Sequence, residues 1–382
     1  MSRFWSRKAG QLEPYVPGEQ PSGRKLLKLN TNECPHPPSE RVLKAIREIE
    51  GVDLLRYPDP NAERLRAALA ERHSLSTDQV FTGNGSDEVL AHLFQALLQR
   101  DGTTVLVPDI SYSFYPVWCQ LYGITLERVP LRDDFSLAPE DYRSDAGSVL
   151  LANPNAPTGM AITTGQVREL LEASVNRLVV VDEAYVDFGA ESAVPLIHEY
   201  DNLVVVRTFS KSHALAGLRI GYALAQKPLI DGLQRVKDSF NSYPLDAVAQ
   251  AAGVAAIEDT AWYDKTCKDV MASRETLSTG LVELGFRVLP SRGNFVFAEH
   301  HQHEGALIFE ALRREEVIVR RWDKPRIANF LRISVGTREQ TADFLRILDQ
   351  VLSRMGQKGG KGEGKGEGKG EGEGEGKGVE KR

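Results

Sequence analysis

The sequence predicts an α/β protein in which a mostly parallel sheet lies between helices, with a smaller α+β domain after it. Short runs of β-branched and other apolar residues alternate with amphipathic stretches that have helical spacing. The runs are apolar on both faces, which is typical of parallel strands covered by helices on both sides. From about residue 262 this alternation changes, and a length of 382 residues is enough for two to three domains of roughly 150 residues.

The N-terminal residues 1–30 are rich in proline and glycine and predict an extended arm. Residues 31–261 form the predicted large domain. Apolar positions at helical spacing predict helices over 86–100 and 163–174. Strands are predicted in four runs, "TTVLVP" at 103–108, "SVLLANP" at 148–154, "RLVVVDEAY" at 177–185 and "LVVVRTFS" at 203–210.

The predicted small domain covers residues 262–355 and starts with a long amphipathic helix. Short strand runs such as "NFVFAEH" and "LRISVG" follow, with a final helix that ends at Met355. The last 27 residues, 356–382, contain 12 glycines and one aliphatic residue. Such a segment cannot offset the entropy lost on ordering, so a disordered Gly/Lys/Glu-rich tail is predicted.

Composition excludes several classes of function. A net charge of -6 gives no basic field for nucleic acid, and no apolar run is long enough for a secretion signal or a membrane span. Cys34, Cys119 and Cys267 form no CxxC pair and have no metal-ligand spacing, so we expect no metal site. A reducing, cytoplasmic location is expected.

Two segments could bind an anion or hold an acid at the edge of the sheet. In "TGNGSDEVL", Gly83 and Gly85 precede a helix whose expected N-cap is Ser86, and the first turn of a helix favours an anion. The same pattern also fits a capped helix without any ligand. In "RLVVVDEAYVDF", Asp182 and Glu183 end a buried strand, where ligands bind in open α/β sheets. The alternative is that both acids only cap the next turn.

Lys211 follows the strand at 203–210, and Arg219 lies eight residues further on. A lysine in a cleft at a strand end can act as a nucleophilic amine, although this segment taken alone favours a solvated lysine. The order of these features along one sheet, together with the loop "NPNAPTG" at 153–159, predicts a site for a phosphorylated aldehyde cofactor that has a ring nitrogen.

These motifs resemble the fold-type I pyridoxal-phosphate enzymes, and within them the aminotransferases of class I and II. The resemblance extends from Tyr15 to about Leu352 and rests on "SKxxxLxGLRxGY", "DEAYxDF", "NPNxPTG" and "LRISVGT". "LEPYVPG", "LNTNECP" and "RYPDP" are similar to the histidinol-phosphate aminotransferase subgroup. The resemblance implies a large domain built on a mostly parallel seven-stranded sheet, pyridoxal 5'-phosphate as cofactor, and a homodimer.

The resemblance also implies a role for each matching residue. Lys211 would bond to the cofactor aldehyde and then move the proton at the substrate Cα, and Asp182 would pair with the ring nitrogen through a carboxylate of depressed pKa. Tyr112 would stack on the ring, and Tyr185 would hydrogen-bond its O3'. The phosphate would be held by Gly85, Ser86, Asp87, Ser210, Arg219 and, from a neighbouring subunit, Tyr57.

Substrate anions would be bound by Arg332 with the help of Arg320 and Tyr15. The adjacent Arg321 is not distinguished from Arg320 by the sequence. The family places an asparagine directly before "PTG" to contact O3', whereas this chain has Ala156 there. We expect Asn155 or Asn153 to replace that amide, Asn155 first, or Tyr185 to act alone.

The expected reaction is transamination of histidinol phosphate with 2-oxoglutarate, giving imidazole acetol phosphate and glutamate in histidine biosynthesis. An aromatic amino-acid aminotransferase is the alternative, and a threonine-phosphate decarboxylase is a further one. A non-catalytic pyridoxal-phosphate protein is a fourth reading. The tail, with seven positive and six negative residues, is too nearly neutral to act as a nucleic-acid arm for such a protein.

Overall fold

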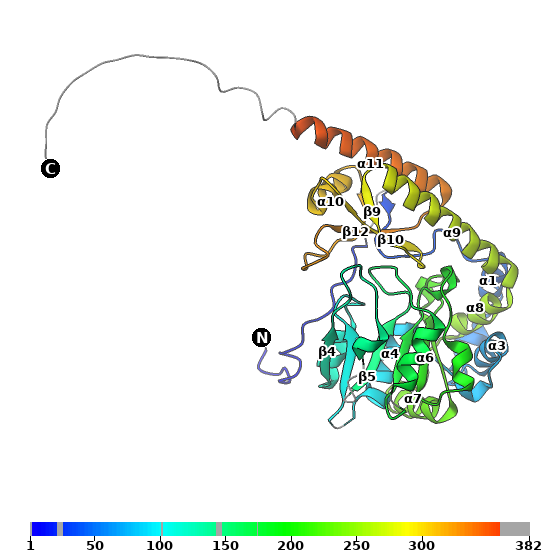
Figure 1. Cartoon of the computed structure of the whole chain (residues 1–382). Helices are drawn as coiled ribbons and strands as arrows, with labels where there is room; N and C mark the ends of the chain where they lie inside the picture. The colour runs from blue at the N-terminus through cyan, green and yellow to red at the C-terminus, as the bar shows by residue number, and fades with distance from the viewer. Residues whose placement is uncertain (1, 21–25, 101, 143–146, 174, 360–382) are drawn as a thin grey trace, which may run out of the picture.

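The computed structural model describes residues 2–20, 26–100, 102–142, 147–173 and 175–359 (Figure 1). Within them, a seven-stranded sheet has the order β2-β8-β7-β6-β5-β3-β4. Neighbouring strands are parallel except at β8, which is antiparallel to both β2 and β7. The predicted mostly parallel α/β sheet is therefore confirmed. Its strands are β2 (Val80–Asn84), β3 (Thr104–Pro108), β4 (Thr125–Val129), β5 (Gly147–Ala152), β6 (Val179–Asp182), β7 (Leu203–Thr208) and β8 (Ile220–Ala225).

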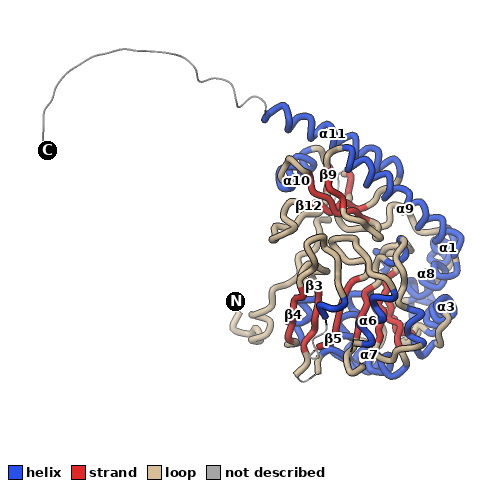
Figure 2. Tube along the Cα trace, in the orientation of Figure 1, coloured by secondary structure: helices blue, strands red, loops and turns tan. Residues whose placement is uncertain are grey.

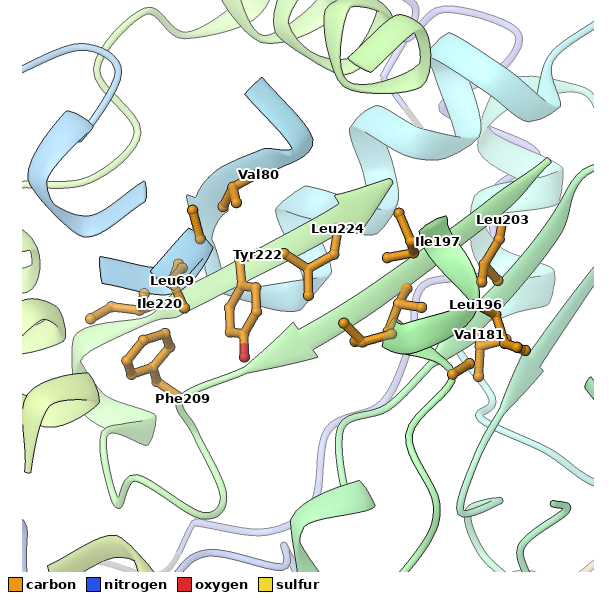
Figure 3. Close-up of a cluster of buried hydrophobic side chains, with 14 of the residues drawn as sticks. Leu69, Val80, Val181, Leu196, Ile197, Leu203, Phe209, Ile220, Tyr222 and Leu224 are labelled. Atoms are coloured by element: carbon orange, nitrogen blue, oxygen red, sulfur yellow. The ribbon is translucent and has the colours of Figure 1, made fainter. Parts of the chain in front are cut away.

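Helices cover both faces of this sheet, as Figure 2 shows in blue against red. Successive residues of the central strands alternate between two cores: Val149 and Val181 face one, whereas Leu150 and Val180 face the other. Part of the first core, with Val181, is drawn in Figure 3. The helices before α9 are α1 (Glu40–Arg47), α2 (Gly51–Leu55), α3 (Glu63–His73), α4 (Gly85–Leu93), α5 (Tyr115–Tyr122), α6 (Thr164–Glu172), α7 (Lys227–Phe240) and α8 (Ala247–Glu258).

A second, antiparallel sheet has the order β12-β10-β9 and packs under two long helices (Figure 1). The short strand β1 (Leu27–Lys28) pairs with β11 (Val317–Ile318), so the end of the predicted arm joins this part of the fold. Its other elements are α9 (Thr260–Glu283), β9 (Phe286–Val288), β10 (Phe295–His300), α10 (Gly305–Arg314), β12 (Phe330–Ser334) and α11 (Arg338–Gly359). We propose that the two domains meet near the junction of α8 and α9.

Two boundaries differ from the sequence prediction. The final helix continues past Met355 to Gly359, so it includes the first residues of the predicted tail, and the rest of that tail lies outside the described residues. The predicted helix over 86–100 begins as α4 and continues as a π-helix from Phe94 to Leu98. No helix in the described ranges has the length and apolar character that a membrane crossing requires.

Candidate active site

The carboxyl ends of β2, β3, β5, β6 and β7 lie at one edge of the large sheet, and the loops after them surround a cavity of about 530 Å³. That volume is within the range of small-molecule sites. The arm and the second sheet contribute the opposite wall. Most of the predicted site residues line this cavity: Tyr15, Ser86, Asp87, Tyr112, Asp182, Tyr185, Ser210, Lys211, Arg219, Arg320 and Arg332.

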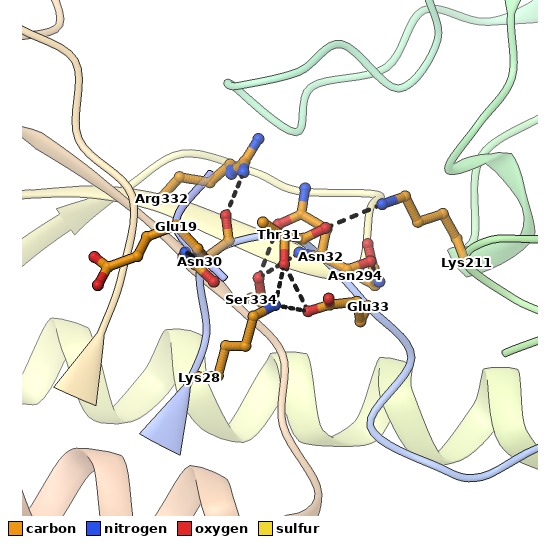
Figure 4. Close-up of polar contacts among 10 residues, drawn as sticks. All are labelled: Glu19, Lys28, Asn30, Thr31, Asn32, Glu33, Lys211, Asn294, Arg332 and Ser334. Carbon is orange, nitrogen blue, oxygen red and sulfur yellow. Dashed lines mark hydrogen bonds and ion pairs between the residues drawn. The ribbon is translucent and has the colours of Figure 1, made fainter. Parts of the chain in front are cut away.

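Lys211 extends into the cavity from the loop after β7. Its Nζ donates a hydrogen bond to the Thr31 carbonyl oxygen at 3.0 Å, as Figure 4 shows, and lies 5.6 Å from the centre of the Tyr185 ring. The side chain is half-buried, so the amine is accessible from the cavity but held by the opposite wall. This is a suitable position for a nucleophilic amine.

Asp182 is buried at the end of β6. Its carboxylate accepts hydrogen bonds from the Tyr115 hydroxyl at 2.9 Å and from the Ala184 backbone N–H at 3.2 Å. Burial raises the pKa of Asp182 to about 6, although these two hydrogen bonds act in the opposite direction. The sequence predicted a depressed pKa for Asp182, which requires a cation against the carboxylate. Among the protein's own groups, the loss of hydration raises this pKa more than the distant charge of Lys211 lowers it.

The anion-binding end of the cavity is formed where α4 meets Arg219. The Arg219 guanidinium contacts Asp87 at 2.9 Å and the Ser210 hydroxyl at 3.4 Å. Gly85 has a φ of +79°, and a Cβ there would lie 2.4 Å from Arg219 Nη2, so only glycine permits this approach. The Asp87 carboxylate is directed at Arg219 rather than free toward a ligand.

The helix start differs from the prediction. α4 begins at Gly85 and Asn84 is its N-cap, so Ser86 does not cap the helix. The Glu88 carboxylate accepts a hydrogen bond from the Asn84 N–H, and the Asn84 side chain does not cap the first turn. Ser86 lies inside the first turn and lines the cavity, where its hydroxyl and the helix N-terminus can both serve an anion.

Aromatic side chains form the walls between the two ends. Tyr112 donates to Asp87 at 3.2 Å and packs edge-on against Tyr115 with ring centres 5.4 Å apart. Burial raises the pKa of Tyr112 far above its ordinary value, so its phenol stays neutral. Tyr15, from the arm, packs against Phe114 with ring centres 4.8 Å apart. A planar ring therefore finds apolar faces here.

The loop after β5 does not supply the amide that the sequence predicted. Asn155 is buried away from the cavity, because its amide donates to the Ile110 carbonyl at 2.9 Å and accepts from Ser111 at 2.9 Å. Asn153 is bonded on both sides to the Ile162 backbone. Asn155 is thus not among the residues that line the cavity, whereas Ala156 is, and the assignment of Asn155 to cofactor binding stays a prediction. Tyr185 is left as the candidate partner for O3'.

Arg332 on β12 is the cation on the side of the second sheet. Its Nη2 donates to the Asn30 carbonyl at 2.7 Å, but its Nε has no hydrogen-bond partner within the described ranges although it is buried. A buried donor without a partner is costly, which indicates that a ligand anion belongs there. Rings of Phe295 and Trp322 hold the guanidinium at 5.5 and 5.1 Å.

The two neighbouring arginines of "VIVRRW" are separated by the fold. Arg320 lines the cavity and donates to the Val16 carbonyl of the arm at 3.3 Å. Arg321 donates to the Ala328 carbonyl at 2.7 Å and pairs with Asp323, and it is not among the residues that line the cavity. The geometry therefore favours Arg320 as the substrate residue.

Tyr57 lies outside this cavity. It is 81% exposed and stacks on Tyr243 with ring centres 4.6 Å apart. Asn30 and Thr31, which were not predicted as site residues, hold Arg332 and Lys211 through their backbone carbonyls. The motif "LNTNECP" was the available signal, but a backbone contact leaves no mark on residue type.

Comparisons with known proteins show the family of this chain. The family described as "Aminotransferase class I and II" matches residues 24–348. The chain is 56% identical to histidinol-phosphate aminotransferase 1 of Bradyrhizobium diazoefficiens, over 92% of this chain and 100% of that protein. It is 53% identical to the histidinol-phosphate aminotransferase of Acinetobacter baumannii (strain AYE), over 91% and 97%.

Solved structures show the same similarity. The fold matches the histidinol-phosphate aminotransferase of Sinorhizobium meliloti in complex with pyridoxal-5'-phosphate with a TM-score of 0.83. That match has 26% identity and covers 93% of this chain and 99% of the other.

Proposed function

This chain belongs to the class I and II aminotransferase family, and from that premise we propose that it is a pyridoxal-phosphate-dependent histidinol-phosphate aminotransferase. It would transfer the amino group of L-histidinol phosphate to 2-oxoglutarate, giving imidazole acetol phosphate and L-glutamate in histidine biosynthesis. The observation that carries the proposal is that a lysine amine, a buried acid and two anion-binding arginines converge on one cavity. The relatives that are 53% and 56% identical to it over the aligned residues bear this name.

The cavity fits the cofactor in its charge and shape. Bound pyridoxal phosphate supplies an aldehyde that takes up the amino group and a ring that withdraws electrons from the substrate. Arg219, Ser210 and Ser86 would bind the phosphate, since a guanidinium and a helix N-terminus both favour a dianion. Asp182 would hold the proton at the ring nitrogen. The cationic ring would then lower the carboxyl pKa that burial raises.

Lys211 would take the proton from the substrate Cα and return it at the C4′ carbon of the cofactor. A primary amine on a flexible stem can reach both atoms, which a guanidinium cannot. Arg332 would bind the substrate anion through its unpartnered donors. Because a guanidinium can donate paired hydrogen bonds to either a phosphate or a carboxylate, the same group can bind histidinol phosphate in one half-reaction and glutamate in the other. Arg320 and Tyr15 would close this end with the arm.

We also propose that the protein is a homodimer and that a second copy completes the phosphate site with its Tyr57. An apolar cluster on and beside α2, between 41% and 81% exposed, supports this: Val52, Leu54, Leu55, Tyr57, Phe240 and Tyr243. The cluster adjoins the start of α4, because the Asn84 amide donates to the Pro244 carbonyl. Contiguous exposed apolar side chains commonly mark an interface.

The three free cysteines fit a reducing, cytoplasmic compartment.

Single-turnover spectroscopy on the purified enzyme loaded with cofactor tests the proposed reaction. We expect cofactor absorbance to change faster with histidinol phosphate than with phenylalanine at equal concentration, and glutamate to form with 2-oxoglutarate. Faster turnover of phenylalanine would favour an aromatic amino-acid aminotransferase, which the aromatic walls of the cavity would also accommodate. Lys211→Ala should lower the turnover rate by at least about a hundredfold. Retained turnover in that variant would refute the role of Lys211.

A further inference from the structure

The segment from Asn30 to Glu33 crosses the cavity between the two sheets. Figure 4 shows that it contacts Lys211 on one side and Arg332 and Ser334 on the other. At its centre, Asn32 is 1% exposed and has a φ of +54°. Asparagine is one of the few side chains that tolerate this left-handed region. A buried polar side chain at a strained position indicates a specific requirement for its hydrogen bonds.

The hydrogen bonds around Asn32 determine which way its amide faces. The Ser334 hydroxyl accepts from the Asn32 backbone N–H at 2.8 Å and donates to Asn32 Oδ1 at 2.9 Å. The amide oxygen is therefore the acceptor on the Ser334 side. Asn294 holds the backbone carbonyl of Asn32 at 2.9 Å. Because the Asn32 amide oxygen accepts from Ser334, the amide nitrogen points the other way, toward Tyr185.

There the Asn32 Nδ2 donates to the Tyr185 hydroxyl oxygen at 3.2 Å. A phenol that accepts one hydrogen bond keeps its own proton for another partner. Tyr185 lines the cavity, so the accepted bond directs its proton toward a bound ligand. The titratable groups near this phenol are Lys211, Arg332, Tyr112 and Tyr115.

We propose that Asn32 is a positioning residue that orients the Tyr185 phenol as a hydrogen-bond donor to the ring oxygen of the cofactor. This inference rests on the proposed function, since it requires pyridoxal phosphate in the cavity. In the family, an asparagine side chain in the loop after β5 contacts this ring oxygen. Ala156 stands at that position and cannot donate a hydrogen bond, so Asn32 takes over part of the role through Tyr185. It also links that phenol to the strand that carries Arg332, since Ser334 lies two residues further along β12.

Two variants of Asn32 separate the side-chain effect from the backbone effect. Asn32→Gly tolerates the left-handed φ and removes only the amide. Asn32→Asp keeps the acceptor toward Ser334 but places a second acceptor against Tyr185, so the phenol proton is drawn away from the ligand. Ser39→Ala is the matched control, because Ser39 is a buried polar residue, 4% exposed, that does not line the cavity, and its hydroxyl accepts a hydrogen bond from the Val42 N–H at the start of α1.

The readout is the pH midpoint of the absorbance change of the bound cofactor. A hydrogen bond donated to the ring oxygen favours its anionic form, so losing that donor raises the midpoint. We expect a rise of about 0.4 to 1 pH unit for Asn32→Gly, the value of one hydrogen bond, and a larger rise for Asn32→Asp. Cofactor affinity should fall by roughly threefold to tenfold in Asn32→Gly. Ser39→Ala should unfold more easily but titrate as the wild type does.

Three outcomes would count against these ideas in different ways. Asn32 variants that titrate at the wild-type midpoint, while the wild type binds cofactor normally, would overturn the positioning role. An equal shift in Ser39→Ala would also overturn it, because the effect would then follow from lost stability alone. A wild-type protein that shows no cofactor absorbance would instead overturn the proposed function.

Discussion

Asp182 is subject to two opposing requirements. Binding a ring nitrogen requires a carboxylate, yet the side chain is 5% exposed and burial raises its pKa from 3.8 to about 6. Tyr115 and the Ala184 N–H stabilise the charged form only in part. The protein therefore holds, at neutral pH, a buried charge whose natural partner is the ligand. Such stored instability is common at catalytic sites.

The linkage between this pKa and folding predicts a stability gain from Asp182→Asn in the cofactor-free protein. A folded pKa above the unfolded one means that the folded state binds the proton more tightly, so stability is lost as the pH rises from about 4 to 6. At pH 8 the variant should be more stable by about 1 to 3 kcal/mol. Transamination should fall on the order of a hundredfold, since an amide cannot keep the ring nitrogen protonated.

Urea unfolding at pH 4 and pH 8 checks the first expectation, and steady-state kinetics check the second. Glu183, whose pKa burial raises to about 7, is present in both proteins, so its contribution to the pH dependence of stability is the same in both. Equal stability of the variant and the wild type at pH 8 would show that Asp182 is not destabilised by burial.

Strand β8 brings the anion site together through the absence of a side chain. Gly221 lies in β8 beside the first turn of α4, where a Cβ would be 2.2 Å from the Ser86 backbone nitrogen. Backbone atoms cannot move aside as a flexible side chain can. Gly221 thus permits a close approach between a strand and a helix, whereas Gly217 has open space around it.

Gly221→Ala should therefore destabilise the protein by at least about 2 kcal/mol, because overpacking forces α4 away from β8. Cofactor affinity should fall as well, since the displaced helix carries Ser86. Gly217→Ala, from the same motif, is the control for stability and should change it by less than about 0.5 kcal/mol. Thermal unfolding and cofactor titration of both variants measure this. Similar stability of the two variants would contradict the packing argument.

At the level of the assembled fold, the cavity lies between two sheets, and the apolar cluster around α2 lies beside its anion-binding end. If a second copy covers that cluster, Leu55→Lys should weaken the dimer and the cofactor site together. Leu55 is 79% exposed, so the change should leave the folding of one subunit intact.

Analytical ultracentrifugation over a range of protein concentrations measures the dissociation of the dimer. Val282→Lys is the matched control, because Val282 is also exposed, at 59%, but lies on α9 away from the cluster. We expect Leu55→Lys to dissociate at least about tenfold more readily, the effect of about 1.4 kcal/mol. Equal association of both variants would place the interface elsewhere.

The sequence alone predicted the class of fold and the main chemical groups, because both depend on short-range patterns. β5, β6 and β7 were recognisable as apolar runs, and Asp182, Lys211 and Arg219 as polar residues placed just beyond such runs. Strands β2, β4 and β8 were not singled out. Gly83 and Gly221 interrupt two of these, and β4 is largely exposed, so their strand pattern is weak.

The tertiary structure was needed wherever a role depends on a partner far along the chain. Asn155 and Asn32 are both asparagines in family motifs, yet the first is bonded to the loop after β3 and the second reaches Tyr185 and Ser334. Arg320 and Arg321 are adjacent in sequence and differ only in the direction that the strand pairing gives them. Local sequence determines which groups are present, but the direction of each donor and acceptor follows from packing between distant segments, because hydrogen bonds act only at short range and at defined angles.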